Sequence, residues 1–447
     1  GVLPIEHGRV LGGQVAVEGL ERLEDGAQRA AKPGIAPRQG GGQHPLLVLG
    51  KRAEHQPRGI GRQLGDGAAG ALDGIRVLDL SRVLAGPYCS MILADHGARV
   101  ISIESRQFIA DGLFFNTVNR NKEHMTLNLK TDEGRQIFFQ LVEKADVILE
   151  GFRPGVVNRL GVDYQSVQKE KPDIIYCSIS GYGQTGAFVD RVGHDVNYLS
   201  KSGALDLIGE PDRPPSIPGI QIADIGGGAM NAAIGILLAL FAREKTGRGQ
   251  YIDISMTDGV VGFLPAALYF QQLTGQDPRR ADAMLSHRYA CYNTYETADG
   301  RYLSIGAVEN RFWKRLCDHL GVPEYAALQY DDARRREIID FMRITFEKKT
   351  LAEWDQELAH LEICWGRIQT LSEVISDPLF REREMILEVP GASGEKQTVI
   401  GVPAKLSETP GSVRSAAVDF GANTASILQE LGYSEKKIKH FAETEVI

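Results

Sequence analysis

The chain has 447 residues, of which 43% are hydrophobic and 24% charged, a composition typical of a globular protein with one large core or two smaller ones. The formal net charge of −8 argues against a general nucleic-acid-binding protein, although it leaves room for a local basic pocket for phosphates. There is no run of about eighteen apolar residues, so we expect no transmembrane helix and predict a buried helix at 229–242. The five cysteines are widely spaced without a CxxC pair, which argues against a zinc knuckle or disulfide framework and fits a reducing cytoplasm.

Residues 1–73 differ in composition from the rest of the chain. They are rich in glycine and contain no Ser, Thr, Asn, Cys, Met, Phe, Tyr or Trp. Such a segment buries little apolar surface to offset its ordering entropy, and it lacks the apolar core of a signal peptide. We predict that it is disordered or is a translated stretch upstream of the native start. A regulatory extension is the functional alternative.

From residue 74 onward, strand and helix patterns alternate. Short apolar strands are predicted at 75–80, 98–104, 146–150 and 174–179, with helices at 88–96, 131–144 and 164–171 and a loop at 81–87. This alternation indicates an α/β fold with a doubly wound, Rossmann-like parallel sheet. In such a fold the ligand is bound by loops that follow the carboxyl ends of the strands.

The second half of the chain has a different pattern. A hairpin is predicted at 292–296 and 302–306, with Asp299-Gly300 as its turn. Further helices are predicted at 311–320, 332–347, 351–361, 371–377, 423–431 and 434–443. We therefore predict a large α/β domain at 74–255, a linker at 256–290, a small α+β domain at 291–400 and a linker with a return to the large domain at 401–447.

Gly193-His194-Asp195 is the first candidate for catalytic chemistry. A histidine next to a carboxylate, after the glycine-rich loop 181–186, suits an acid/base site. The alternative is a surface loop with an incidental histidine.

Asp224, followed by the glycines at 226–228, is the second candidate. An aspartate before an apolar helix is commonly only an N-cap. Glycines, however, let the backbone approach a ligand closely, and a helix N-terminus offers free N–H groups to an anion. Asp224 could thus supply a carboxylate beside an oxyanion site for a thioester enolate.

Glu309 and a set of basic residues carry weaker signals. Glu309 follows a predicted strand of the small domain, where a glutamate is normally only solvated. Arginine pairs well with phosphate, but most single arginines only solvate a surface. Because no GxGxxG or Walker A motif is present, we expect neither NAD nor ATP. The basic residues near predicted strand ends are Arg82, Arg106, Arg120, Lys122, Arg153 and Arg159.

Seven ordered motifs resemble one family. They occupy 77–87, 93–98, 151–155, 159–161, 181–184, 223–228 and 245–250, and include Gly151-Phe-Arg-Pro-Gly155 and Ala223-Asp-Ile-Gly-Gly-Gly228. On these motifs the chain, from Gly74 to near its C-terminus, resembles the family III CoA-transferases and α-methylacyl-CoA racemases (the CaiB/BaiF family).

The resemblance implies a large doubly wound domain, a small domain and an interlocked homodimer whose active sites lie between subunits. It implies an acyl-CoA substrate, with coenzyme A bound as part of that substrate, and neither a tightly bound cofactor nor a metal. Neither nucleic acid nor a membrane is an expected partner. The residues expected to contact CoA are Val83, Leu84, Ala85, Gly151, Phe152, Arg159 and Leu160, and Arg106 is a further candidate for its phosphates.

The resemblance also implies two possible reactions. In the transferases the aspartate at Asp224 is a nucleophile that forms a mixed anhydride and then a thioester, whereas in the racemases it is one of two acid/base residues. The chain resembles the racemases at His194, with Asp195 beside it, and at Glu309. It departs from them at 281–289, which lacks their glycine-rich stretch. We favour a 2-methylacyl-CoA racemase. A CoA-transferase is the alternative, and a catalytically inactive CoA-binding protein is a third reading.

Overall fold

The computed structural model describes residues 70–110, 116–391 and 394–447. The prediction of disorder for 1–73 falls almost wholly outside these residues. The described chain divides into two compact units. The first segment of the larger unit ends at Ala267, and Arg279–Ala281 and Gln369–Ile447 complete this unit. The smaller unit consists of Leu268–Pro278 and Asp282–Ile368.

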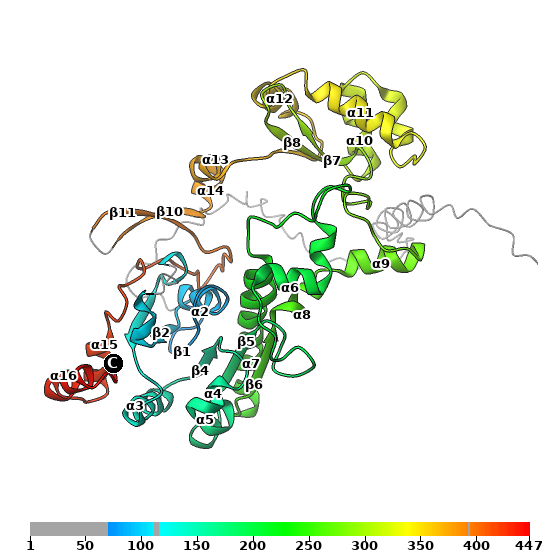
Figure 1. Ribbon diagram of the computed structural model, residues 1–447. Helices are drawn as coiled ribbons and strands as arrows, with labels where there is room; N and C mark the ends of the chain where they lie inside the picture. The colour runs from blue at the N-terminus through cyan, green and yellow to red at the C-terminus, as the bar shows by residue number, and fades with distance from the viewer. Residues whose placement is uncertain (1–69, 111–115, 392–393) are drawn as a thin grey trace, which may run out of the picture. The chain divides into compact units, whose positions relative to one another are not determined.

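A six-stranded sheet forms the centre of the larger unit, in the order β3-β2-β1-β4-β5-β6 (Figure 1). All neighbouring strands are parallel, which confirms the predicted doubly wound fold. The two edge strands, β3 and β6, are not among the predicted strands, and β3 has the mostly polar sequence Lys-Glu-His-Met-Thr. The strands are β1 (Arg76–Asp79), β2 (Arg99–Glu104), β3 (Lys122–Thr126), β4 (Val147–Glu150), β5 (Ile175–Ser180) and β6 (Tyr251–Ser255).

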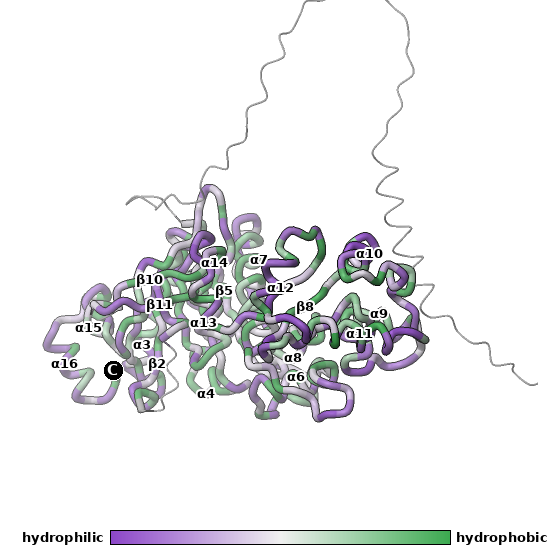
Figure 2. The backbone as a smooth tube through the Cα atoms, turned by 90° about the horizontal axis from the view of Figure 1, so that it is seen from above, coloured by the Kyte–Doolittle hydropathy of each residue, from purple (hydrophilic) through white to green (hydrophobic). Residues whose placement is uncertain are grey.

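Helices cover both faces of this sheet, and each face has its own hydrophobic core. Strand residues alternate between the faces, so Leu78 belongs to one core and Val77 to the other. In Figure 2 the tube is hydrophobic along β5, all of whose residues are buried. The first core is covered by α3 (Asp132–Val142), α4 (Val156–Leu160), α5 (Tyr164–Glu170), α15 (Thr424–Glu430) and α16 (Glu435–Glu443). The second is covered by α2 (Ala85–Asp95), α6 (Asp195–Ser202), the π-helical segment η4 (Ile222–Met230), α7 (Asn231–Thr246) and α8 (Met256–Val261).

The apolar helix is longer than the predicted 229–242. Segment η4 leads directly into α7, so that one helix runs over Ile222–Thr246. Among the residues described, it is the one helix long and apolar enough to cross a membrane, and 44% of its most apolar window is buried. The expectation of a buried helix is therefore only half right. The buried side is mostly alanine, while the opposite side exposes Met230, Ile234, Leu237, Leu238 and Phe241.

The smaller unit contains the predicted hairpin. Strands β7 (Tyr292–Glu296) and β8 (Tyr302–Gly306) pair antiparallel, and β9 (Trp365–Arg367), which was not predicted, joins β8. Trp313, Phe346 and Trp354 are almost fully buried in its core. The packed helices are α10 (Asn310–His319), α11 (Arg335–Phe346) and α12 (Leu351–Leu358).

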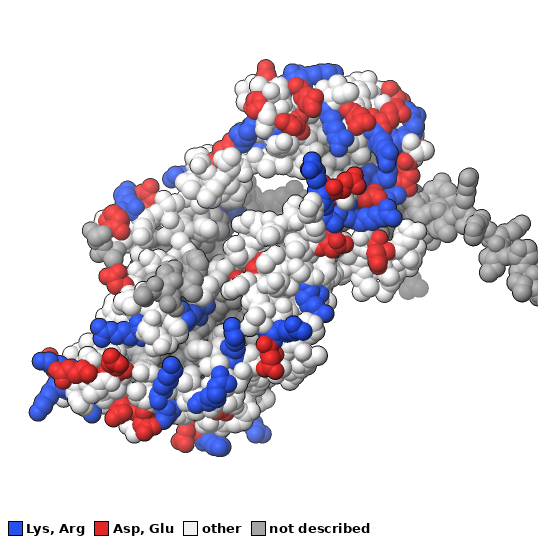
Figure 3. Space-filling view, viewed as in Figure 1, with Lys and Arg blue, Asp and Glu red and all other residues white. Residues whose placement is uncertain are grey.

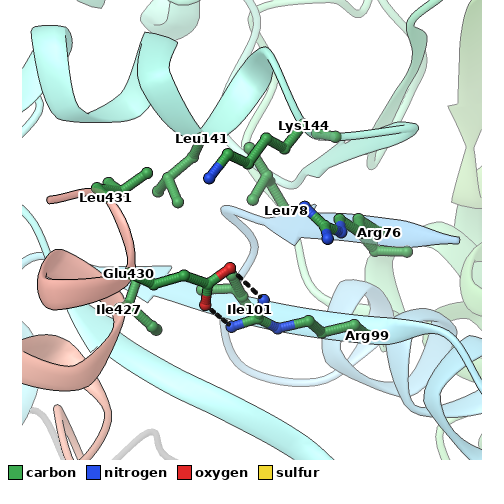
Figure 4. Close-up of a pocket in the computed structure, with 11 residues that line it drawn as sticks. Arg76, Leu78, Arg99, Ile101, Leu141, Lys144, Ile427, Glu430 and Leu431 are labelled. Atoms are coloured by element: carbon green, nitrogen blue, oxygen red, sulfur yellow. Dashed lines mark hydrogen bonds and ion pairs between the residues drawn. The ribbon is translucent and has the colours of Figure 1, made fainter. Parts of the chain in front are cut away.

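A narrow recess lies at the amino ends of β1 and β2, where Arg76 and Arg99 begin their strands. Figure 4 shows that Glu430 of α15 reaches the Arg99 guanidinium in a two-point ion pair, with N–O distances of 2.8 and 2.6 Å. Arg99 also pairs with Glu123 at 2.6 Å. The recess therefore reflects how the C-terminal helices attach to the sheet, and it lies at the end opposite to the predicted ligand loops.

Candidate functional site

The loops after β1 and β4 occupy the point where the strand order reverses. In doubly wound sheets this is where ligands bind. The two loops touch, since a Cβ added to Gly151 would lie 3.3 Å from the Ser81 Cβ. Val83 and Leu84 follow β1, whereas Gly151 and Phe152 follow β4. The remaining predicted CoA contacts are Ala85, which is the first residue of α2 and not part of a loop, and Arg159 and Leu160, which end α4.

Buried polar groups fix the turn after β1. Asp79 accepts the N–H of Ser81 at 2.9 Å, and the Lys122 ammonium donates to the Pro87 carbonyl at 2.7 Å. Val83 adopts a φ of 72°, a left-handed conformation that β-branched residues rarely adopt. The turn is thus held in an unusual shape at the edge where the ligand is expected, a common property of functional loops.

Two of the basic residues suggested for phosphate have structural roles. Lys122 is 4% exposed and bound to Pro87 and Asn119. Arg120 is equally buried and pairs with Asp95 at 2.7 Å. The others lie in exposed or partly exposed positions. Arg106 begins the short helix η1 (Arg106–Ala110) after β2.

His194, Asp195 and Asp224 come together although 29 residues separate Asp195 from Asp224. His194 is the N-cap of α6, and Asp195 begins that helix. The Asp195 Oδ1 atom accepts the N–H groups of Ala223 at 2.6 Å and Asp224 at 3.0 Å. This carboxylate therefore joins the first turn of α6 to the first turn of η4.

The surroundings of Asp224 tune its acidity. Partial burial raises the pKa of Asp224 to about 6, the negative charge of Asp195 adds to the rise, and His194 lowers it. A carboxyl with this pKa exchanges protons readily near neutral pH, which suits acid/base catalysis. His194 itself is exposed.

The prediction of free N–H donors for an oxyanion at the helix start is wrong for residues 223–225, because their N–H groups already have partners. The N–H groups of Ala223 and Asp224 bind Asp195, and that of Ile225 binds the Gln221 carbonyl at 3.0 Å. Asp224 is also not an N-cap, because helical structure begins at Ile222. The π-helical turn, which sequence periodicity does not reveal, accounts for both differences.

Two of the glycines after Asp224, Gly227 and Gly228, lie where helices pack closely. A Cβ on Gly227 would lie 2.5 Å from the Met256 carbonyl, and one on Gly228 would lie 2.8 Å from the Met256 side chain. On the other side of this contact, a Cβ on Gly259 would lie 2.1 Å from the Gly227 carbonyl. The glycines thus let η4 and α8 cross closely.

Tyr182 and Tyr198, both outside the set of predicted site residues, shape the histidine loop, which is the segment 181–194 between β5 and α6. Tyr198 donates a hydrogen bond to the Gly193 carbonyl at 2.5 Å and packs edge-on against Tyr182 with 5.3 Å between ring centroids. Gly181 is needed beside it, because a Cβ there would lie 2.4 Å from the Tyr198 ring. The available signal was their position close to these motifs: Tyr182 directly follows Gly181, and Tyr198 follows His194 within the first turn of α6.

Glu309 lies in the smaller unit as the N-cap of α10, where its side chain is exposed and makes no capping hydrogen bond. A catalytic role for Glu309 stays a prediction.

We expect Asp195→Ala to lower kcat by about 10²-fold, because loss of the acceptor for two N–H groups lets Asp224 move. Asp195→Asn keeps an oxygen acceptor and should recover part of this loss. It removes the charge that raises the pKa of Asp224, so the acid limb of the pH–rate profile should move below pH 6. Steady-state kinetics from pH 5 to 8 checks both effects. Equal inactivity of the two variants would instead make Asp195 a direct proton donor or acceptor.

The candidate site thus brings an acidic group and a histidine together beside a doubly wound sheet. The sequence profile of CoA-transferase family III matches residues 72–424. The chain is 34% identical to human α-methylacyl-CoA racemase, over 84% of this chain and 97% of the relative. It is 36% identical to succinyl-CoA:mesaconate CoA-transferase of Haloarcula marismortui, over 81% and 97%. The crystal structure of a CaiB/BaiF family protein from Brucella suis superimposes with a TM-score of 0.72 at 30% identity, covering 82% of this chain and all of that one. The chain belongs to CoA-transferase family III.

Proposed function

We propose that the protein is a racemase of 2-methylacyl-CoA thioesters. The observation that carries the proposal is the pairing of His194 with Asp224, two proton-transfer groups on separate helices whose first turns are joined by Asp195. A family relative at 34% identity is named a racemase, which supports the choice.

In the proposed mechanism the CoA part of the substrate lies on the loops after β1 and β4, and the α-carbon lies between His194 and Asp224. One group removes the α-proton to give an enolate, and the other delivers a proton to the opposite face. Because partial burial raises the pKa of Asp224 to about 6, it can act in either direction near neutral pH.

A CoA-transferase is the second candidate, because a transferase is equally similar at 36% identity. In that reaction Asp224 attacks the acyl-CoA carbonyl and expels the CoA thiolate, leaving an acyl–aspartyl anhydride. The returning thiolate attacks the aspartyl carbonyl and releases the carboxylic acid, and the aspartyl thioester then passes CoA to a second acid. This route predicts ping-pong kinetics and needs an acceptor acid.

A single assay separates the candidates. One enantiomer of a 2-methylacyl-CoA is incubated with the enzyme without any carboxylic acid, and its optical purity is followed by chiral chromatography after hydrolysis. The racemase proposal predicts a steady approach to the racemate. Preserved optical purity, together with CoA transfer once succinate or another acid is added, would support the transferase.

We further propose that the protein forms a homodimer of the interlocked kind implied by the resemblance. The apolar side of α7 supports this, since Ile234, Leu238 and Phe241 are 54%, 64% and 63% exposed. Figure 3 shows Lys, Arg, Asp and Glu side chains of both signs on the face in view.

The double variant Leu238→Asp/Phe241→Asp should be monomeric at concentrations where the wild type is dimeric, because desolvating two carboxylates in an apolar interface is costly. Sedimentation velocity measures the mass. Ile344→Asp, which alters an equally exposed isoleucine of α11, is the control and should stay dimeric. A monomeric wild type, or a dimeric double variant, would contradict the proposal.

A further inference from the structure

Glu150, the last residue of β4, lies beneath the turn expected to contact CoA. Its side chain is 1% exposed, and its Oε2 atom accepts the Phe152 N–H at 2.7 Å. Among the residues that the structure describes, no cation forms an ion pair with it. Burial of a carboxylate without a cation is costly, so a neutral side chain would serve better if the position were only structural.

A row of polar side chains leads from Glu150 across the sheet. Ser178 lies opposite Glu150 on β5, and its hydroxyl group lowers the pKa of the Glu150 carboxyl group. Tyr251 of the edge strand β6 donates to the Ser178 hydroxyl at 3.0 Å, and 37% of Tyr251 is exposed. Two hydroxyl groups thus lie between the buried carboxyl and the surface.

Burial, together with the groups around it, places the titration of Glu150 in the neutral range. Burial raises the pKa of Glu150 to about 7, against the hydrogen bonds from Ser178 and Phe152, and Asp253 of β6 adds to the rise. Asp253 itself accepts the Gln184 N–H at 3.0 Å. The other groups that interact with Glu150 are Tyr176, Cys177 and Tyr251, whose pKa values burial raises, so they stay neutral in this range.

We propose that Glu150 is a positioning residue of the acyl-CoA site, whose carboxylate holds the Gly151–Phe152 turn in the conformation that receives CoA. Protonation of Glu150 leaves a neutral acceptor, and a hydrogen bond to a neutral acceptor is about half as strong as a charge-assisted one. The affinity for CoA therefore falls as the pH decreases through the titration of Glu150. The inference rests on the proposed function only in taking CoA as the ligand, and it holds for a racemase or a transferase.

Isothermal titration calorimetry with free coenzyme A at pH 8 and pH 6 tests the inference. At pH 8, Glu150→Gln should bind CoA about fivefold more weakly than the wild type, because its amide oxygen is a neutral acceptor. At pH 6 the two proteins should bind almost equally, since Glu150 is then protonated. Comparison at the same pH cancels the titration of the CoA phosphates and of the shared site residues. Glu143→Gln, at the exposed end of α3, is the control and should match the wild type at both pH values.

A second variant covers the case in which Glu150→Gln does not fold. Ser178→Ala removes a hydrogen bond that lowers the pKa of Glu150, so the loss of CoA affinity should begin at a higher pH than in the wild type. An affinity ratio for Glu150→Gln that is the same at both pH values, or an unshifted Ser178→Ala profile, would overturn the inference. A wild type that fails to bind CoA at all would overturn the proposed function as well. CoA binding without racemisation or transfer would leave the role of Glu150 intact.

Discussion

Asp224→Asn should lower kcat by about 10²–10⁴-fold in either candidate reaction. The amide has nearly the shape of the carboxyl, and the backbone N–H of Asp224 can still donate to Asp195. The side-chain amide of this variant, however, can neither accept the α-proton nor attack a thioester. The loss should therefore appear in kcat, while CoA binding measured by calorimetry stays within a few fold of the wild type. Asp190→Asn, which removes an exposed carboxylate of the histidine loop, is the matched control and should keep full activity. Activity of Asp224→Asn close to that of the wild type would remove Asp224 from the mechanism.

His194→Ala should separate the two reactions. A two-base racemase loses one of its proton-transfer groups, so racemisation should fall by about 10²–10⁴-fold. A transferase uses Asp224 as nucleophile, so transfer between an acyl-CoA and a carboxylic acid should only weaken. His440→Ala, at an exposed position of α16, is the control and should change neither rate. Full racemase activity in His194→Ala would contradict the racemase proposal.

The central sheet was largely predictable because its inner strands are buried on both faces. Strands such as β4 and β5 form short, mostly apolar runs that sequence alone identifies as parallel strands. The edge strand β6 was missed, although its Tyr-Ile-Asp-Ile-Ser alternation is a period-two signal. Its alternate positions carry Tyr251, which donates a hydrogen bond to Ser178 next to Glu150, and Asp253, whose charge raises the pKa of Glu150.

The contacts within the candidate site could not be predicted from the sequence, and the roles of its residues stay predictions. His194 and Asp224 stand out as residue types in recognisable motifs. The bonds from Asp195 to the N–H groups at 223 and 224 depend on how two distant helices meet, and on a π-helical turn that no residue pattern announces. Glu150 carried one local signal, a lone acidic residue at the end of an apolar strand.

Exchange of the substrate α-proton in deuterated water tests the central claim, that His194 and Asp224 transfer protons at the α-carbon of an acyl-CoA. The protein is incubated with a single enantiomer of a 2-methylacyl-CoA without acceptor acid, and the α-proton signal is followed by NMR. The proposed mechanism predicts enzyme-dependent deuterium incorporation with loss of optical purity, abolished in both Asp224→Asn and His194→Ala. Binding of the acyl-CoA without exchange, together with a covalent acyl-CoA-dependent adduct on Asp224, would contradict it and establish the transferase reaction.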